Sequence, residues 1–175
     1  MYTLRLSRPL LARFAPADPE VGATPRTTTS LGDWYVRSIH AAGRDLLLCT
    51  SEASGLSIVM PAERLGELPE HLVRDLIALL HTIGVPPAHV AAEADAMTDG
   101  IVGAARNPQA TRAMQVIARR ARTRLAEMQA SRLDVGELHR ALAGHRGALS
   151  GKATAAERAA SLLHRSSEAP QRRKR

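Results

Sequence analysis

Three short apolar segments that follow one another closely limit the folds open to this chain more than any other feature. They cover Trp34 to His40, Leu46 to Thr50 and Leu56 to Met60, and the turn-rich links AAGR and SEASG separate them. Links of this length join neighbouring antiparallel strands. The sequence therefore predicts a three-stranded antiparallel meander.

The pattern within these segments indicates how the strands are buried. In the first segment, Trp34 and Val36 share one face, and Tyr35, Arg37 and Ile39 share the other. Successive side chains of a strand point to opposite faces, so these two groups lie on different sides of the predicted sheet. The second segment contains the uninterrupted apolar run LLLC, which is typical of burial on both faces and predicts the central strand of the meander.

The residues before the meander predict a strand, a short helix and a loop. YTLRL at residues 2–6 alternates like a strand, and Ser7 with Pro9 suits the start of a helix that reaches about Phe14. Residues 15–32 contain three prolines, one glycine before the final Gly32, and a Thr/Ser run, a composition typical of a loop.

Helical spacing dominates the chain after the meander. Apolar residues recur at intervals of three and four from Leu72 to Ile83, and Gly84 ends that helix. Pro86-Pro87 opens a second helix that runs to about Met97, and Gly100 with Gly103 brackets a short edge strand. Asn107-Pro108 then begins a helix that reaches Met128 or beyond, because asparagine caps free amides and proline is tolerated in the first turn.

These expectations combine into an α+β fold. The sheet is expected to be small and antiparallel, formed by the meander and the N-terminal strand, and covered by helices. Residues 1–128 are expected to form this domain. Residues 129–165 are expected to form a weakly helical basic extension, and residues 166–175 a disordered basic tail.

Charge divides the chain unevenly. The net charge is +7, yet residues 1–105 carry 8 arginines against 12 acidic residues, whereas residues 106–175 carry 16 basic residues against 5 acidic ones. Such asymmetry indicates a basic segment with an anionic partner.

The segment LGDWYVRSIHAAGRDLLLCTSEASGLSIVMPA resembles an uncharacterised bacterial domain-of-unknown-function family. The family has a Gly-Asp-Trp-Tyr strand start, here Gly32 to Tyr35, and a helix that ends in Leu-Gly-Ile-Pro, here Ile83 to Pro86. The resemblance covers residues 1–128. It implies an N-terminal strand and short helix ahead of the meander, and it implies no chemistry because the family has no established activity.

A second family segment lies near the start of the predicted helix at Asn107. The family has an Asn-Arg-Ser segment seven residues ahead of a Met-Asn pair, and this segment corresponds to Asn107 and Met114. The chain differs from the family in having Pro108 for Arg, Arg112 for Gly and Gln115 for Asn.

The same helix carries the strongest candidate site. At about 100° per residue, Met114, Ile117, Ala118, Ala121, Leu125 and Met128 fall on one face and arginines on the rest. Guanidinium groups in a row neutralise phosphates without reading sequence. We therefore expect a nonenzymatic module that binds RNA or DNA backbone through Arg106, Arg112, Arg119, Arg120, Arg122, Arg124, Arg172, Arg173, Lys174 and Arg175.

Other interpretations stay open for this arginine-rich helix. It is also compatible with a solvated face, with docking on the acidic front part of the chain, or with a small helix-turn-helix unit. A protein-interaction or regulatory component, such as an antitoxin or adaptor, is the main alternative function. In that case the arginines would dock an acidic protein surface.

Catalytic and metal sites have weaker signals. An enzyme of unknown class would use Asp33, His40 and Cys49, but Cys49 lies in the most apolar strand, where a thiol usually packs as a small hydrophobe. His89, Glu93, Asp95 and Asp99 lack a second histidine at the matching turn, so a solvated acidic helix end explains them better than a metal site. No metal and no cofactor is expected.

The cellular location is expected to be cytoplasmic. The single cysteine cannot form an internal disulfide. No apolar run approaches the roughly 18 residues that a membrane helix needs, so no membrane association is expected.

Overall fold

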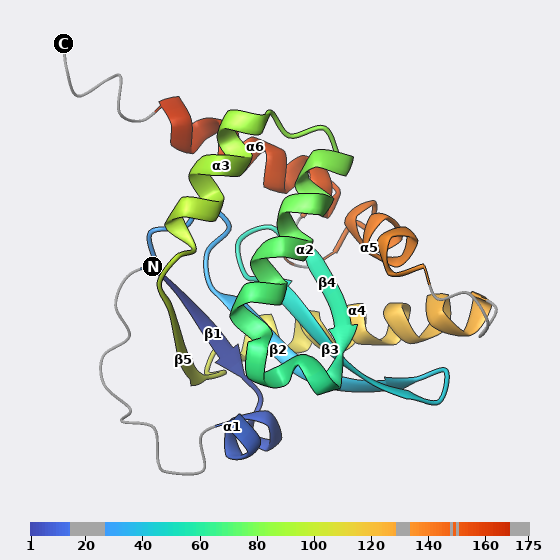
Figure 1. The fold of residues 1–175 in the computed structure, drawn as a ribbon. Coiled ribbons are helices and arrows are strands. Elements are labelled where there is room, and N and C mark those ends of the chain that lie inside the picture. Colours follow the sequence, from blue (N-terminus) through green and yellow to red (C-terminus); the bar gives the residue numbers. More distant parts are fainter. Residues whose placement is uncertain (15–26, 129–133, 148, 150, 169–175) are drawn as a thin grey trace.

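The computed structural model describes residues 1–14, 27–128, 134–147, 149 and 151–168 (Figure 1). Strands and helices alternate in blocks along the chain. Their order is β1 (Tyr2–Leu6), α1 (Arg8–Phe14), β2 (Trp34–Ala41), β3 (Arg44–Ser51), β4 (Ser57–Pro61), the 3-10 helix η1 (Ala62–Glu67), α2 (Leu68–Thr82), α3 (Pro87–Ala96), β5 (Gly100–Ala104), α4 (Pro108–Glu127), α5 (Val135–Ala143) and α6 (Ala155–Glu168).

The five strands form one sheet in the order β4-β3-β2-β1-β5. The predicted α+β class and the antiparallel meander are confirmed, with β3 between its two antiparallel neighbours. The expected edge strand is β5. The sheet is mixed and not wholly antiparallel, because β1 lies parallel to both β2 and β5. Two parallel strands must be joined by a long connection, because the chain has to return to the same end of the sheet before the second strand begins.

Helices cover both faces of this sheet (Figure 1). Trp34, Val36 and Cys49 belong to a core cluster that includes α2, α3 and α6. Ile39 and Leu48 belong to a second cluster with α4 and α5 on the opposite face. The predicted alternation along β2 and the two-sided burial of β3 are thereby confirmed. The resulting arrangement is two helical layers with a sheet between them.

The helix boundaries follow the expected capping residues. α2 ends at Thr82, and Gly84, which follows the C-cap residue Ile83, has a φ of 82°. The Gly84 amide donates to the His81 carbonyl and the Val85 amide donates to the Leu80 carbonyl, the pair of bonds that defines a Schellman motif. Pro86 and Pro87 then start α3. Glycine is needed here because the left-handed conformation is unfavourable for other residues.

The helices α5 and α6 lie in the segment that the sequence assigned to a weakly helical extension. Leu138 and Leu142 of α5 are buried in the cluster that α4 forms with the sheet. Ala159 and Leu163 of α6 are buried in the cluster on the other face. Both helices therefore contribute side chains to the core of the sandwich. Of the loop expected at residues 15–32, residues 15–26 lie outside the described residues. Of the disordered tail expected at residues 166–175, residues 166–168 instead form the end of α6, and residues 169–175 lie outside the described residues.

The tight turn between β2 and β3 gives the first prediction. Ala42 and Gly43 have φ values of 50° and 69°, as both central residues of a type I′ turn must. Alanine is disfavoured there and asparagine is tolerated. Replacing Ala42→Asn should raise the free energy of unfolding by about 0.5 to 1 kcal/mol, measured by urea denaturation.

A β-branched residue provides the opposite test at the same position. Ala42→Val should lower the free energy of unfolding because branching at Cβ is a poor fit to positive φ. Equal stability of the Asn and Val variants would show that the turn does not hold this conformation in solution.

Candidate anion-binding surface on α4

The start of α4 is fixed by its capping residue. The Asn107 side-chain oxygen accepts hydrogen bonds from the amides of Gln109 at 2.9 Å and Ala110 at 3.3 Å, and Pro108 occupies the first turn. These bonds satisfy amides that have no partner within the helix. The predicted start of the helix at Asn107-Pro108 is confirmed.

One side of α4 is buried against the sheet, where the helix packs on β2. Alanine supplies most of this side, which allows the helix to approach the strands closely. The buried residues are Ala110, Ala113, Met114, Ile117, Ala118, Ala121 and Leu125. This matches the apolar face expected from the sequence and directs the arginines away from the core.

The exposed side of α4 and the residue before its cap carry six arginines. We call these residues the arginine surface: Arg106, Arg112, Arg119, Arg120, Arg122 and Arg124, all of which are exposed. Arg124 forms an ion pair with Glu127 at 2.9 Å, and the Arg120 guanidinium contacts the His145 ring. Within the described part of the chain, Arg112, Arg119 and Arg122 form no ion pair with a carboxylate.

A further arginine that the sequence analysis did not select lies beside this surface. Arg37 of β2 is partly buried, and its Nε has no hydrogen-bond partner among the described residues. Burial, and secondly the charge of Arg122, lower the pKa of Arg37. Two cations therefore lie close together where α4 meets β2. The strand alternation carried this signal, since it placed Arg37 on the face that α4 covers.

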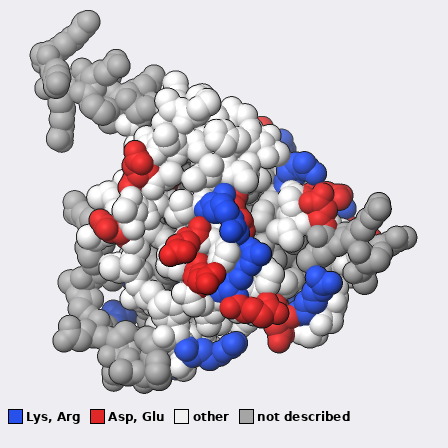
Figure 2. Space-filling view, viewed as in Figure 1, with Lys and Arg blue, Asp and Glu red and all other residues white. Residues whose placement is uncertain are grey.

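Figure 2 shows the molecule from the side of α2, which lies in front of the sheet in Figure 1, while α4 lies behind it. Acidic and basic side chains are intermixed on this side, and Arg74 pairs with Asp75 at 3.1 Å. The expected contribution of Arg172, Arg173, Lys174 and Arg175 lies outside the described residues.

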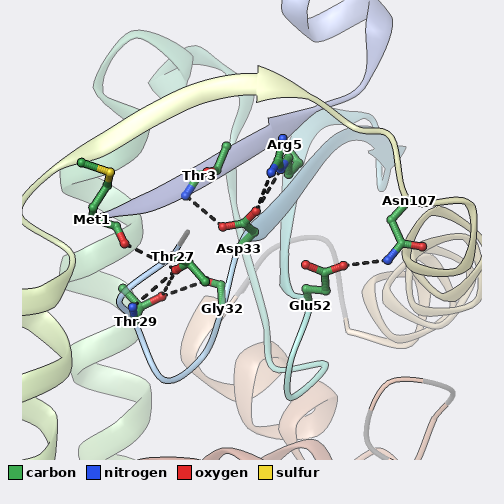
Figure 3. A network of polar contacts seen from close by, with 9 residues as sticks. All are labelled: Met1, Thr3, Arg5, Thr27, Thr29, Gly32, Asp33, Glu52 and Asn107. Carbon is green, nitrogen blue, oxygen red and sulfur yellow. Dashed lines mark hydrogen bonds and ion pairs between the residues drawn. The ribbon is translucent and has the colours of Figure 1, made fainter. Parts of the chain in front are cut away.

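A polar network ties the start of α4 to the sheet (Figure 3). The Asn107 Nδ2 donates to Glu52 Oε1 at 2.7 Å, at the turn between β3 and β4. Next to it, Arg5 pairs with Asp33 at 2.8 Å, and Asp33 also accepts from the Thr3 amide at 3.2 Å. Both members of the Arg5–Asp33 pair are largely buried, so removal of either would leave a costly unpaired charge. The network thus fixes β1, β2 and α4 relative to one another.

The three residues of the enzyme interpretation are not brought together. Asp33 is engaged by Arg5, and His40 pairs with Asp45 at 2.8 Å on the exposed hairpin. Cys49 is completely buried in the core. Burial raises the pKa of its thiol well above the usual value, which opposes formation of the thiolate nucleophile.

One of the candidate metal residues, Glu93 of α3, has a structural role. Glu93 was expected on a solvated helix end, but it is only 2% exposed. Its carboxylate accepts hydrogen bonds from the amides of Ser30 at 2.9 Å and Leu31 at 3.0 Å, and so fixes the segment that leads into β2. In the described ranges, no group of three or more His, Cys, Asp or Glu side chains is placed to hold a metal ion.

The fold and the arginine surface define an α+β domain with one basic helical face, and comparison with known proteins agrees with the expected family. A family model described as a domain of unknown function, DUF6933, matches residues 3–149. The chain belongs to this family. The match extends beyond the expected residue 128 and includes α5. No curated protein matches the chain.

Among the helices that the structure describes, none combines the length and the apolar character needed to cross a membrane.

The Asn107–Glu52 contact gives a second prediction. Asn107→Asp keeps the capping oxygen but places a second carboxylate against Glu52 in place of the amide donor. The free energy of unfolding should fall by about 1 to 2 kcal/mol at neutral pH. The double variant Asn107→Asp with Glu52→Gln restores a donor–acceptor pair and should recover most of this loss in chemical denaturation. Additive effects would show that the two side chains do not interact.

The burial of Cys49 gives a third prediction. In the folded protein the thiol should react with an aromatic disulfide reagent at least about 10³-fold more slowly than in the unfolded chain, because the reagent needs an opening of the core. A control with Cys49→Ala and Ser38→Cys, which places the thiol on an exposed position, should react rapidly. Rapid reaction of native Cys49 would support the enzyme interpretation.

Proposed function

We propose that this domain is a nonenzymatic binding module whose arginine surface contacts the phosphate backbone of RNA or DNA. The observation that carries the proposal is the set of three exposed α4 arginines, Arg112, Arg119 and Arg122, that form no ion pair with described carboxylates. Unpaired guanidiniums on one helix attract phosphates and release their counterions. Arg37 adds to this surface, because its unpaired Nε and its neighbour Arg122 favour an anion between them.

The dimensions of α4 suit a nucleic-acid backbone. Arg112 and Arg122 are ten residues apart, which corresponds to about 15 Å along a helix. That length passes roughly four phosphates on one strand of a duplex. Contacts of this kind fix the position of a protein on the backbone but carry no sequence information.

The aromatic residues favour a duplex or a structured RNA over a single strand. Single strands are usually bound by stacking bases on exposed aromatic rings. Tyr2, Trp34 and Tyr35 are all at most 3% exposed, and Phe14 is partly buried. Recognition would therefore rest on phosphates. The location that we propose for the protein is cytoplasmic.

A protein partner is the second candidate, and one residue favours it. Val116 lies between the arginines of α4 and is 49% exposed, one of the most exposed large apolar side chains among the described residues. An exposed apolar side chain with arginines on either side of it along the helix is complementary to an acidic protein surface that has an apolar centre. The domain would then act as an adaptor or as a regulatory component of the antitoxin type.

Salt dependence distinguishes the two candidates. Replacing Arg112, Arg119 and Arg122 by Gln should weaken binding to a duplex of about 20 base pairs and reduce the slope of log K against log salt by about 0.9 per lost contact. The measurement is a fluorescence anisotropy titration between about 50 and 200 mM salt, the range over which phosphate contacts weaken most clearly. The free energy of unfolding should stay close to that of the parent.

A matched control removes the same charge elsewhere. Arg8, Arg13 and Arg44 are exposed on α1 and the β2–β3 hairpin, and their replacement by Gln should leave the slope nearly unchanged. Failure of the unaltered protein to bind duplex DNA or duplex RNA at low salt would contradict the proposal. Binding to a protein partner that depends less on salt than duplex binding does, and that is lost in Val116→Asp, would favour the second candidate.

A further inference from the structure

A pocket of about 380 Å³ lies where β4, α2 and α5 meet, apart from the arginine surface. It is bounded by β4, an edge strand of the sheet, and by residues of α2 and α5. Cavities of this size accommodate small molecules.

His139 of α5 forms one side of the pocket and closes the edge of β4. Its Nε2 lies 2.9 Å from both the amide nitrogen and the carbonyl oxygen of Val59. Burial lowers the pKa of His139 and so favours the neutral ring, and one of these two contacts satisfies an edge-strand group. The imidazole is thereby held in place, and its Nδ1 has no protein partner within the described residues.

Two side chains of opposite charge also line the pocket. The Asp75 side chain of α2 is 20% exposed and pairs with Arg74 at 3.1 Å on its outer side. Arg64 of η1 is partly buried and forms no ion pair with a described carboxylate. A partly buried guanidinium without a counter-ion favours an anion from outside the protein.

Most of the remaining lining is apolar. Met60 and Leu79 are at most 3% exposed, and Val135 of α5 also lines the pocket. These side chains would cover an aliphatic or aromatic group of moderate size and remove it from water. A ligand that uses the whole pocket therefore carries a positive group, a negative group and an apolar body.

We propose that this pocket binds a zwitterionic amino acid with an apolar side chain. The carboxylate would lie on the Arg64 guanidinium, the ammonium group would lie near Asp75 and His139, and the side chain would lie on Leu79 and Val135. A ligand with a carboxylate but no ammonium group would bring a second negative charge near Asp75. A ligand with an ammonium group but no carboxylate would leave Arg64 without a counter-ion. The zwitterion is thus favoured over either.

Ligand analogues, tested on the unaltered protein, give the decisive test. Calorimetric titration with leucine should show saturable binding. N-acetyl-leucine, which lacks the ammonium charge, and leucinamide, which lacks the carboxylate, should each bind about tenfold more weakly or worse, because each loses one charge-assisted contact. Glycine, which lacks the apolar body, should not bind measurably.

Variants of the pocket test the assigned contacts. Asp75→Asn and Arg64→Gln should each weaken leucine binding about tenfold or more. Glu70→Gln on the exposed side of α2 and Arg13→Gln on α1 change the same charges away from the pocket and should not alter it. Circular dichroism checks that each variant is folded.

Two results would overturn this proposal. One is the absence of leucine binding at millimolar concentration, and the other is equal binding of leucine, N-acetyl-leucine and leucinamide. The analogue series uses only the unaltered protein, so it tests the proposed ligand class even if a substitution in the pocket unfolds the chain. It is also independent of any nucleic-acid binding by α4.

Discussion

Burial of β2 and β3 on both faces is the constraint on which the rest of this structure depends. The two strands carry aliphatic and aromatic side chains on each side, so neither face of the sheet can be left to solvent. One helical layer, formed by α2, α3 and α6, covers the face of Trp34 and Leu47. The other face is covered by α4 and α5. The position of α4, and with it the direction of its arginines, follows from the need to cover Ile39 and Leu48.

Small side chains make this packing close. Alanines at the contact bring the α4 backbone near β2, and the same closeness partly buries Arg37 beside Arg122. Nearby, the carboxylates of Asp33 and Glu52 are taken up by Arg5 and Asn107. Acidic groups around the start of α4 are therefore occupied. Further along the helix Arg124 pairs with Glu127, whereas Arg112, Arg119 and Arg122 form no ion pair with the described acids. This separation of charge is what distinguishes the α4 side from the mixed surface in Figure 2.

Much of this architecture is local enough to be predicted from the sequence. The meander, the alternation along β2, the end of α2 before Gly84 and the start of α4 at Asn107 each depend on a few adjacent residues. What the sequence did not indicate depends on partners far apart in the chain. The parallel pairing of β1, the two amides held by Glu93, the proximity of Arg37 to Arg122 and the pocket at His139 all require contacts across many residues.

The bond between Asn107 and Glu52 has a consequence for any partner of α4. It anchors the first turn of the helix to the sheet, and the buried alanines hold the turns that follow. The backbone beneath the guanidiniums is then already ordered before an encounter, and only the long arginine side chains lose torsional freedom on contact. Such a surface combines an ordered helix backbone with flexible arginine side chains. Its association with a partner should therefore proceed with little change in heat capacity from folding of the chain.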